Sequence, residues 1–64
     1  MKKFIGSIYS QDNKQYGTIT CIIEGIGYRG GFPTFKIRWL SHPNGGGTSE
    51  SNQYEFLQYF NKVA

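Results

Sequence analysis

The sequence is poor in the side chains that build disulfides and metal sites. It has one cysteine, Cys21, and one histidine, His42. A single cysteine excludes an internal disulfide and a cysteine-based zinc site, and it is typical of the reducing cytoplasm. Because no second His or Cys ligand accompanies His42, we expect a solvent-facing turn residue there and no metal site.

Long apolar runs are also missing. No segment approaches the roughly 18 apolar residues of a membrane span. The apolar stretch near the N-terminus is broken by Gly6 and Ser7, and it is too short for the apolar part of a signal peptide. We therefore expect a soluble protein of the cytoplasm, or of the host cytoplasm if the chain is viral, with no membrane partner.

Acidic side chains are few, and no two of them are spaced for acid–base chemistry. Asp12 is the only aspartate, and Glu24, Glu50 and Glu55 are scattered along the chain. General acid–base catalysis needs groups within hydrogen-bond reach of one substrate atom. The pattern therefore predicts no enzyme, no cofactor and no small-molecule substrate.

The chain does contain many aromatic side chains in a short length. Phe, Tyr and Trp make up 17% of the 64 residues, which is typical of a folded, sheet-rich chain. This length predicts a single domain, residues 1–64, whose small core supplies only a few kcal/mol of stability. The net charge of +3 suits contact with phosphate or with an acidic protein, without indicating a dedicated polycation.

Apolar and polar residues alternate in two segments, residues 16–24 and residues 34–40, which predicts two half-buried strands. Their apolar faces carry Ile19, Cys21, Ile23, Phe35, Ile37 and Trp39. We expect these six side chains to form the core, with Cys21 as a buried structural thiol rather than a nucleophile. Residues 3–9 and 48–52 are predicted to add two short strands.

Residues 25–30 read GIGYRG, which matches the G-x-G-x-x-G pattern of phosphate-binding loops. A dinucleotide site of that kind needs a helix whose amides face the pyrophosphate, but here the motif runs into a predicted strand. We therefore interpret residues 25–33 as a long irregular hairpin loop whose glycines supply positive φ. Its exposed Tyr28, Arg29 and Phe32 form a candidate contact surface.

A second candidate surface is the polar face of the strand predicted at residues 34–40. Lys36 and Arg38 alternate there beside Trp39. Small β-barrels use positive side chains flanked by aromatic rings to hold nucleic-acid backbones and to stack bases. The same spacing is also typical of the solvated face of an amphipathic strand, so both interpretations stay open.

The last twelve residues allow two structures. Apolar residues at helical spacing, and Asn52 followed three residues later by Glu55, indicate a capped helix. Alternatively, one helical turn at residues 53–57 leads into a final short strand at residues 58–63. We favour the second structure because a small sheet must close its edges.

Taken together, these segments resemble the small SH3-like β-barrels of the KOW and Tudor kind that occur in many short bacteriophage proteins. The resemblance is carried by Tyr16-Gly17-Thr18-Ile19, by Phe35-Lys36-Ile37-Arg38-Trp39 and by residues 48–57. It implies an all-β fold, a five-stranded SH3-like barrel with a short 3₁₀ or helical turn near the C-terminus. It also implies binding rather than catalysis, in a phage or bacterial setting.

Members of such families bind nucleic acid, the transcription or translation apparatus, or peptides. The resemblance therefore implies a non-enzymatic module that binds nucleic acid or a nucleoprotein machine. We expect the contacts to come from Tyr28, Arg29, Phe32, Lys36 and Arg38. The alternative is a protein-binding module, such as a phage inhibitor that docks on a host or defence protein with the same aromatic loop.

Overall fold

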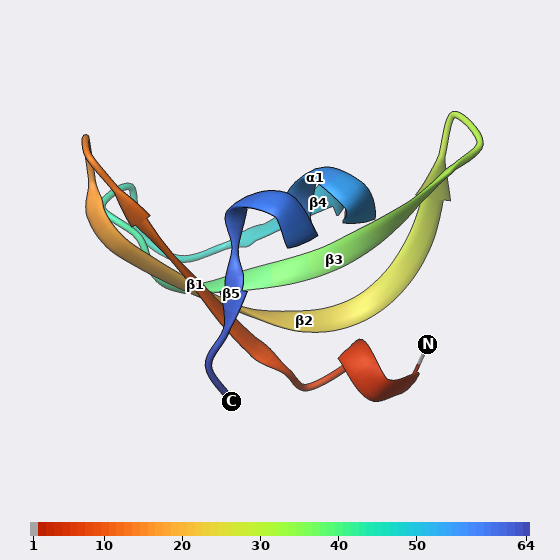
Figure 1. Ribbon diagram of the computed structural model, residues 1–64, viewed down its shortest axis with the longest axis horizontal. Helices are drawn as coiled ribbons and strands as arrows, with labels where there is room; N and C mark the ends of the chain where they lie inside the picture. The colour runs from red at the N-terminus through yellow and green to blue at the C-terminus, as the bar shows by residue number, and fades with distance from the viewer. Residues whose placement is uncertain (1) are drawn as a thin grey trace.

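The computed structural model describes residues 2–64, which form one antiparallel sheet of five strands with a short helix (Figure 1). In chain order the elements are η1 (Lys2–Phe4), β1 (Ile8–Asn13), β2 (Gly17–Arg29), β3 (Phe32–Ser41), β4 (Thr48–Asn52), α1 (Gln53–Tyr59) and β5 (Asn61–Lys62). The strand order is β4-β3-β2-β1-β5. The prediction of a mostly β chain with a helical element near its C-terminus is confirmed. Within residues 2–64, no helix combines the length and apolar character needed to cross a membrane.

The two longest strands, β2 and β3, form a hairpin on which the rest of the sheet is built. Their pairing continues, with two register shifts, until Arg29 lies opposite Phe32. The prediction of an irregular loop over residues 25–33 is therefore wrong, because only Gly30 and Gly31 form the turn, with φ of 59° and 84°. Pairing with β3 overrides the low strand propensity of the glycines in β2.

The N-terminal residues are not the strand predicted at residues 3–9. Lys2–Phe4 forms the 3₁₀ turn η1, and β1 begins only at Ile8. Gly6 lies between them with φ of 90°, a left-handed conformation that interrupts extended backbone. Its N–H nevertheless donates to the carbonyl oxygen of Ile23 at 2.8 Å, so this segment stays attached to β2.

The C-terminal residues form a helix and then a strand, as in the favoured alternative. Asn52 caps α1, since its Oδ1 accepts from the N–H groups of Tyr54 at 2.8 Å and Glu55 at 3.2 Å. β5 follows and pairs with β1. The helix thus carries the chain from β4, one edge of the sheet, to β5, the other edge (Figure 1).

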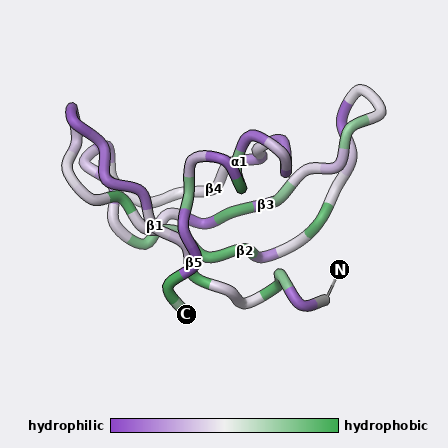
Figure 2. Tube along the Cα trace, viewed as in Figure 1, coloured by the Kyte–Doolittle hydropathy of each residue, from purple (hydrophilic) through white to green (hydrophobic). Residues whose placement is uncertain are grey.

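The core lies where the sheet meets η1 and α1. Phe35 is at its centre, with the ring centroids of Phe4 and Phe56 at 5.0 and 5.3 Å. The buried apolar cluster comprises Tyr9, Cys21, Ile23, Phe35, Ile37 and Phe56. Figure 2 shows hydrophobic segments along the central stretches of β2 and β3, as this cluster requires.

Five of the six predicted core residues are buried, and Trp39 is the exception. Its indole N–H donates to Ser49 Oγ at 3.2 Å. One side of the ring faces the turn at residues 45–47, whose glycines have no side chains to cover it. Cys21 is fully buried as predicted, and burial raises the pKa of its thiol to about 11.

Phe35→Ala is expected to unfold the domain or leave it barely stable, whereas Trp39→Ala should remain folded. Truncating a fully buried Phe costs roughly 3–5 kcal/mol, which is comparable to the whole stability that a core of this size provides. Trp39 is only half-buried, so its truncation removes less buried area. Thermal unfolding followed by far-UV circular dichroism measures both losses, and equal losses would contradict the central position of Phe35.

Candidate binding surface

The far part of the β2–β3 hairpin, residues 24–38, forms an arm that ends at the turn (Figure 1). Gly30 and Gly31 both have positive φ, as a type I′ turn requires. The twist of this turn matches the twist of the strands it joins, so β2 and β3 stay paired up to the turn while the arm curves away from the rest of the sheet (Figure 1). All five residues predicted to form the site lie on this arm.

Strand alternation divides these five residues between two faces of the arm. One face, which we call the outer face, carries Arg29, Phe32, Lys36 and Arg38. Tyr28 projects to the opposite face, which it shares with Ile26 at the margin of the core. Tyr28 and Phe32 are 74% and 56% exposed, but the structure does not bring them together.

Glu50 on β4 connects the three strands beneath the outer face. It accepts one hydrogen bond from the Thr34 hydroxyl of β3 and another, at 3.0 Å, from Arg29 Nη2 of β2. The Thr34 hydrogen bond, followed by the positive charges of Arg29 and Lys36, holds the pKa of Glu50 below its ordinary value. Glu50 is therefore an ionised carboxylate that ties the arm to the edge strand.

Arg38, the second arginine of the outer face, is also paired. Its Nε donates to Glu24 Oε2 at 2.7 Å, and this hydrogen bond raises the pKa of the guanidinium. Both side chains are well exposed, so the pair contributes little to stability. Its main effect is on charge: with three cations and two carboxylates, the outer face has one net positive charge.

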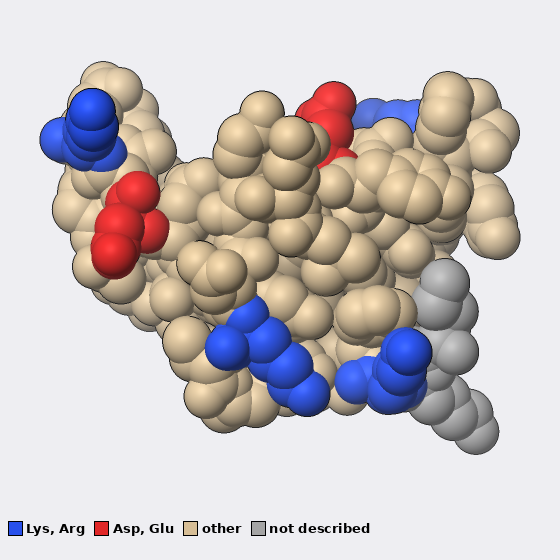
Figure 3. Space-filling model, viewed as in Figure 1, with Lys and Arg blue, Asp and Glu red and all other residues tan. Residues whose placement is uncertain are grey.

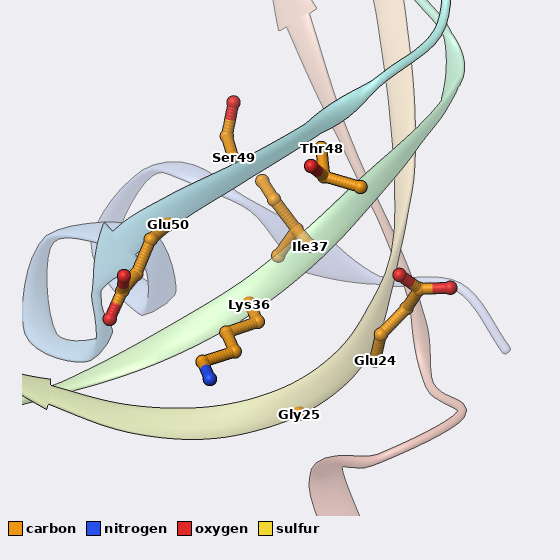
Figure 4. Close-up of a pocket in the computed structure, with 7 residues that line it drawn as sticks. All are labelled: Glu24, Gly25, Lys36, Ile37, Thr48, Ser49 and Glu50. Carbon is orange, nitrogen blue, oxygen red and sulfur yellow. The ribbon is translucent and has the colours of Figure 1, made fainter.

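Lys36 lies in a shallow groove between these two ion pairs. The groove has a volume of about 440 Å³ and is lined by Glu24, Gly25, Lys36, Ile37, Thr48, Ser49 and Glu50. Figure 4 shows the Lys36 side chain extending from β3 over β2, with Glu24 and Glu50 on either side. The groove therefore presents one positive charge, on Lys36, beside two negative charges, on Glu24 and Glu50. Such a surface suits a partner that carries charges of both signs better than it suits a row of phosphates.

Gly27 provides the space that the Glu50 network occupies. A Cβ at this position would lie 3.0 Å from both Glu50 Oε2 and Thr34 Oγ1, and 3.2 Å from Lys36 Cε. A Cβ at Gly25 would make only ordinary contacts with Lys36, at 3.6 and 3.8 Å. The first glycines of the GIGYRG motif thus lie within a strand, and no helix begins after the motif.

The residues of this surface that sequence reasoning missed are the two acceptors, Glu24 and Glu50. Each is an isolated carboxylate in the sequence, which gives no signal of a site. The signal lies in the register, because Glu50 stands opposite Lys36 in the β3–β4 ladder. Opposite charges on facing residues stabilise a sheet, so pairing residues 48–52 with residues 34–40 would have indicated it.

A second group of aromatic side chains surrounds Trp39 at the other end of β3. His42 lies between Tyr16 and Trp39, with ring centroids at 5.5 and 4.9 Å. Trp39 in turn contacts Phe60, at 6.1 Å between centroids. His42 does lie at the turn, as predicted, since its carbonyl oxygen accepts from the N–H of Gly45. Its imidazole is only partly open to solvent, however, because the two aromatic neighbours half-bury it.

Comparisons with protein-family models, with curated proteins and with solved structures found no match to this chain. Across residues 2–64, no three His, Cys, Asp or Glu side chains come together as a possible metal site. A function for the chain therefore has to be argued from its own residues and their geometry.

Gly27→Ala is expected to destabilise the protein, while Gly25→Ala should be tolerated. The new methyl group at residue 27 would push Glu50 or Thr34 away by a few tenths of an ångström and strain their hydrogen bond, and overpacking of this kind costs roughly 1–3 kcal/mol. Residue 25 is the matched control on the same face of β2. Urea unfolding measures both variants, and equal stabilities would show that the network does not need the space at residue 27.

Glu50 is expected to make the stability sensitive to acid. Because its folded-state pKa lies below the ordinary 4.5, the contribution is complete above about pH 4.5 and is lost as pH falls through the lowered pKa. Glu50→Gln should therefore reduce the difference in Tm between about pH 7 and about pH 3. Glu55→Gln, in the exposed first turn of α1, is the control. An unchanged difference in Glu50→Gln would contradict the proposed network.

Proposed function

We propose that the chain is a non-enzymatic binding module built on a partly open SH3-like barrel. Three features support this fold: the strand order, the register shifts in the β2–β3 ladder, and a short helix that joins the two edge strands. Bulges bend strands and increase twist, which lets a small sheet curl towards closure. The resemblance of residues 16–19, 35–39 and 48–57 to such barrels supports the same proposal.

The proposed contact surface is the outer face of the arm, with Phe32 as its apolar anchor. Phe32 is exposed next to the turn, and Arg29 lies directly opposite it. Lys36 and its groove continue the surface towards β4. Aromatic residues and arginine are enriched at protein interfaces and dominate their binding energy.

The observation that favours a protein partner is the pairing of both arginines with carboxylates of the chain itself. Arg29 to Glu50 measures 3.0 Å and Arg38 to Glu24 measures 2.7 Å. A phosphate on this face would have to displace a carboxylate or lie beside it, whereas a protein surface can match charges of both signs. Figure 3 shows basic side chains at the upper left, along the lower margin and at the upper right of the face in view, with acidic side chains beside some of them.

Binding to nucleic acid stays a prediction, supported by the net charge of +3 and by Lys36. In the phage or bacterial setting that the resemblance implies, the proposed partner is a host protein, and inhibition of that protein is the simplest role for so small a module. Both alternatives use the outer face, but they depend on different residues of it. Nucleic acid would depend on Lys36 and Arg38, and a protein partner would depend on Phe32.

Titration with labelled single-stranded DNA, duplex DNA and RNA at about 50 mM salt tests for nucleic acid. We expect no saturable binding in the micromolar range. If nucleic acid does bind, and Lys36→Ala with Arg38→Ala flattens the slope of log K against log salt by about 2, the outer face binds phosphates and the protein proposal fails.

Affinity capture from nuclease-treated bacterial lysate, with identification by mass spectrometry, tests for the protein partner. We expect one protein to be retained by the wild type and lost with Phe32→Ala, because an exposed aromatic anchor contributes most of the affinity of a small interface. Tyr54→Ala is the matched control, since Tyr54 is 67% exposed on α1. Retention of the same protein by Phe32→Ala would place the interface elsewhere.

A further inference from the structure

Although β2 is an inner strand of the sheet, its C-terminal half has a free edge on the side where β1 pairs with its first half. β1 pairs with β2 as far as Ile22, and two backbone hydrogen bonds at Ile23 extend this contact by one residue. From Gly25 to Arg29, β2 is paired with β3 on one side, while no strand of residues 2–64 pairs with its other side. In Figure 1 this stretch is the end of β2 that runs to the turn at the upper right.

The phase of the pairing identifies the free groups as the backbone of Ile26 and Tyr28. In a two-residue hairpin the flanking residues, here Arg29 and Phe32, form a hydrogen-bonded pair. Hydrogen-bonded and non-hydrogen-bonded pairs alternate along the ladder. Tyr28 therefore forms a non-hydrogen-bonded pair with Pro33, which has no N–H, and Ile26 forms the next non-hydrogen-bonded pair, with Phe35. The N–H and C=O groups of Ile26 and Tyr28 therefore point to the free edge, and residues 2–64 supply no hydrogen-bond partner for them.

Apart from the register shift between Ile23 and Gly25 at its start, this edge has neither charge nor proline to protect it. Free edge strands in most proteins are short, or they carry charge or proline. β5 has two residues, and β4 is a polar strand with Glu50 at its centre. Residues 25–28 of β2 have no charge and no proline. The charges at the two ends of this stretch, Glu24 and Arg29, are held by ion pairs on the outer face.

We propose that this edge pairs with the same edge of a second copy of the chain, antiparallel, about a twofold axis at Gly27. Ile26 of each copy then lies opposite Tyr28 of the other, and each pair exchanges both of its backbone hydrogen bonds. The exposed Tyr28 ring covers Ile26 across the interface, as an aromatic and β-branched pair. At the axis Gly27 of one copy faces Gly27 of the other, and neither adds a side chain to the outer face.

The ion pairs at the two ends of the edge are compatible with this antiparallel arrangement. Glu24 lies at one end of the free stretch and Arg29 at the other, and each is already paired within its own chain. A twofold axis places the Glu24–Arg38 pair of each copy near the Arg29–Glu50 pair of the other, whereas a parallel pairing would place Glu24 beside Glu24 and Arg29 beside Arg29. The edge is thus complementary to itself in hydrogen bonding and in side-chain packing, and a second copy is the partner that satisfies both.

The dimer is weak, and it does not depend on the proposed function. A contact made by one short edge falls below the area of roughly 1,200 Å² that stable complexes bury, so association requires high protein concentration. The second copy adds to β2 in the plane of the sheet, whereas the side chains of the outer face, including Phe32, project out of that plane and stay free in the dimer. A failure of the dimer therefore leaves the proposed partner surface intact, and the reverse also holds.

Amide hydrogen exchange at about 1 mM and about 20 µM protein tests the proposal. We expect the amides of Ile26 and Tyr28 to exchange at least about fivefold more slowly at the higher concentration. The amide of Glu50, on the unpaired β4 edge, is the internal control and should not change. Sedimentation velocity at the same concentrations should show a dimer only at the higher one.

Tyr28→Pro removes an N–H that the β2–β3 ladder does not use, so it should abolish the dimer and preserve the fold. Tyr28→Phe keeps the ring and the N–H and should dimerise like the wild type. Should Tyr28→Pro fail to fold, Tyr28→Lys places a charge on the edge and gives the same expected loss. A chain that is monomeric at about 1 mM, protection at the β4 edge instead, or a dimer that survives Tyr28→Lys would overturn the proposal.

Discussion

The contact between Phe35 and Phe56 holds the molecule together. Phe35 comes from the middle of β3 and Phe56 from α1, and their ring centroids are 5.3 Å apart. Phe4 reaches the same ring from η1 at 5.0 Å. A sheet of this size leaves its apolar face in water unless another element covers it, so helix docking and sheet formation depend on each other. The arm depends on them too, because Phe35 anchors β3 between Thr34 and Lys36, both of which face the other way.

Period-2 burial made much of this fold predictable from the sequence. The alternation through Ile19, Cys21 and Ile23 reflects burial of one strand face, and local sequence is enough to show it. The partial exposure of Trp39 was not predictable in this way, because it depends on which residues after β3 come to face the ring. Which residues cover the Trp39 ring is decided by tertiary structure.

The arm and its charges show the same limit more clearly. Residues 25–29 have the composition of a loop, yet pairing with residues 32–36 makes them a strand. Glu24 and Glu50 become partners of Arg38 and Arg29 only through the register of three strands. The position of Lys36 and Arg38 on the polar face of one strand was therefore predictable, whereas Arg29 belongs to β2 and not to a loop, and the neutralisation of both arginines by carboxylates was not visible. That neutralisation is what shifts the balance from phosphate towards a protein surface of mixed charge.

The position of Trp39 also determines which structural changes alter the tryptophan fluorescence of this protein. It is the only tryptophan of the chain, and its ring contacts His42 and Phe60, at the junction of β3, α1 and the turn that follows β3. The turn beside Phe32 lies at the opposite end of the hairpin, so a ligand held there leaves the indole in the same surroundings, whereas a ligand in the Lys36 groove reaches Ser49, the hydrogen-bond partner of the indole. Detachment of α1 would remove Phe60 from the ring and admit water, which moves the emission to longer wavelength. Intrinsic fluorescence thus reports helix docking and is insensitive to events at the hairpin turn.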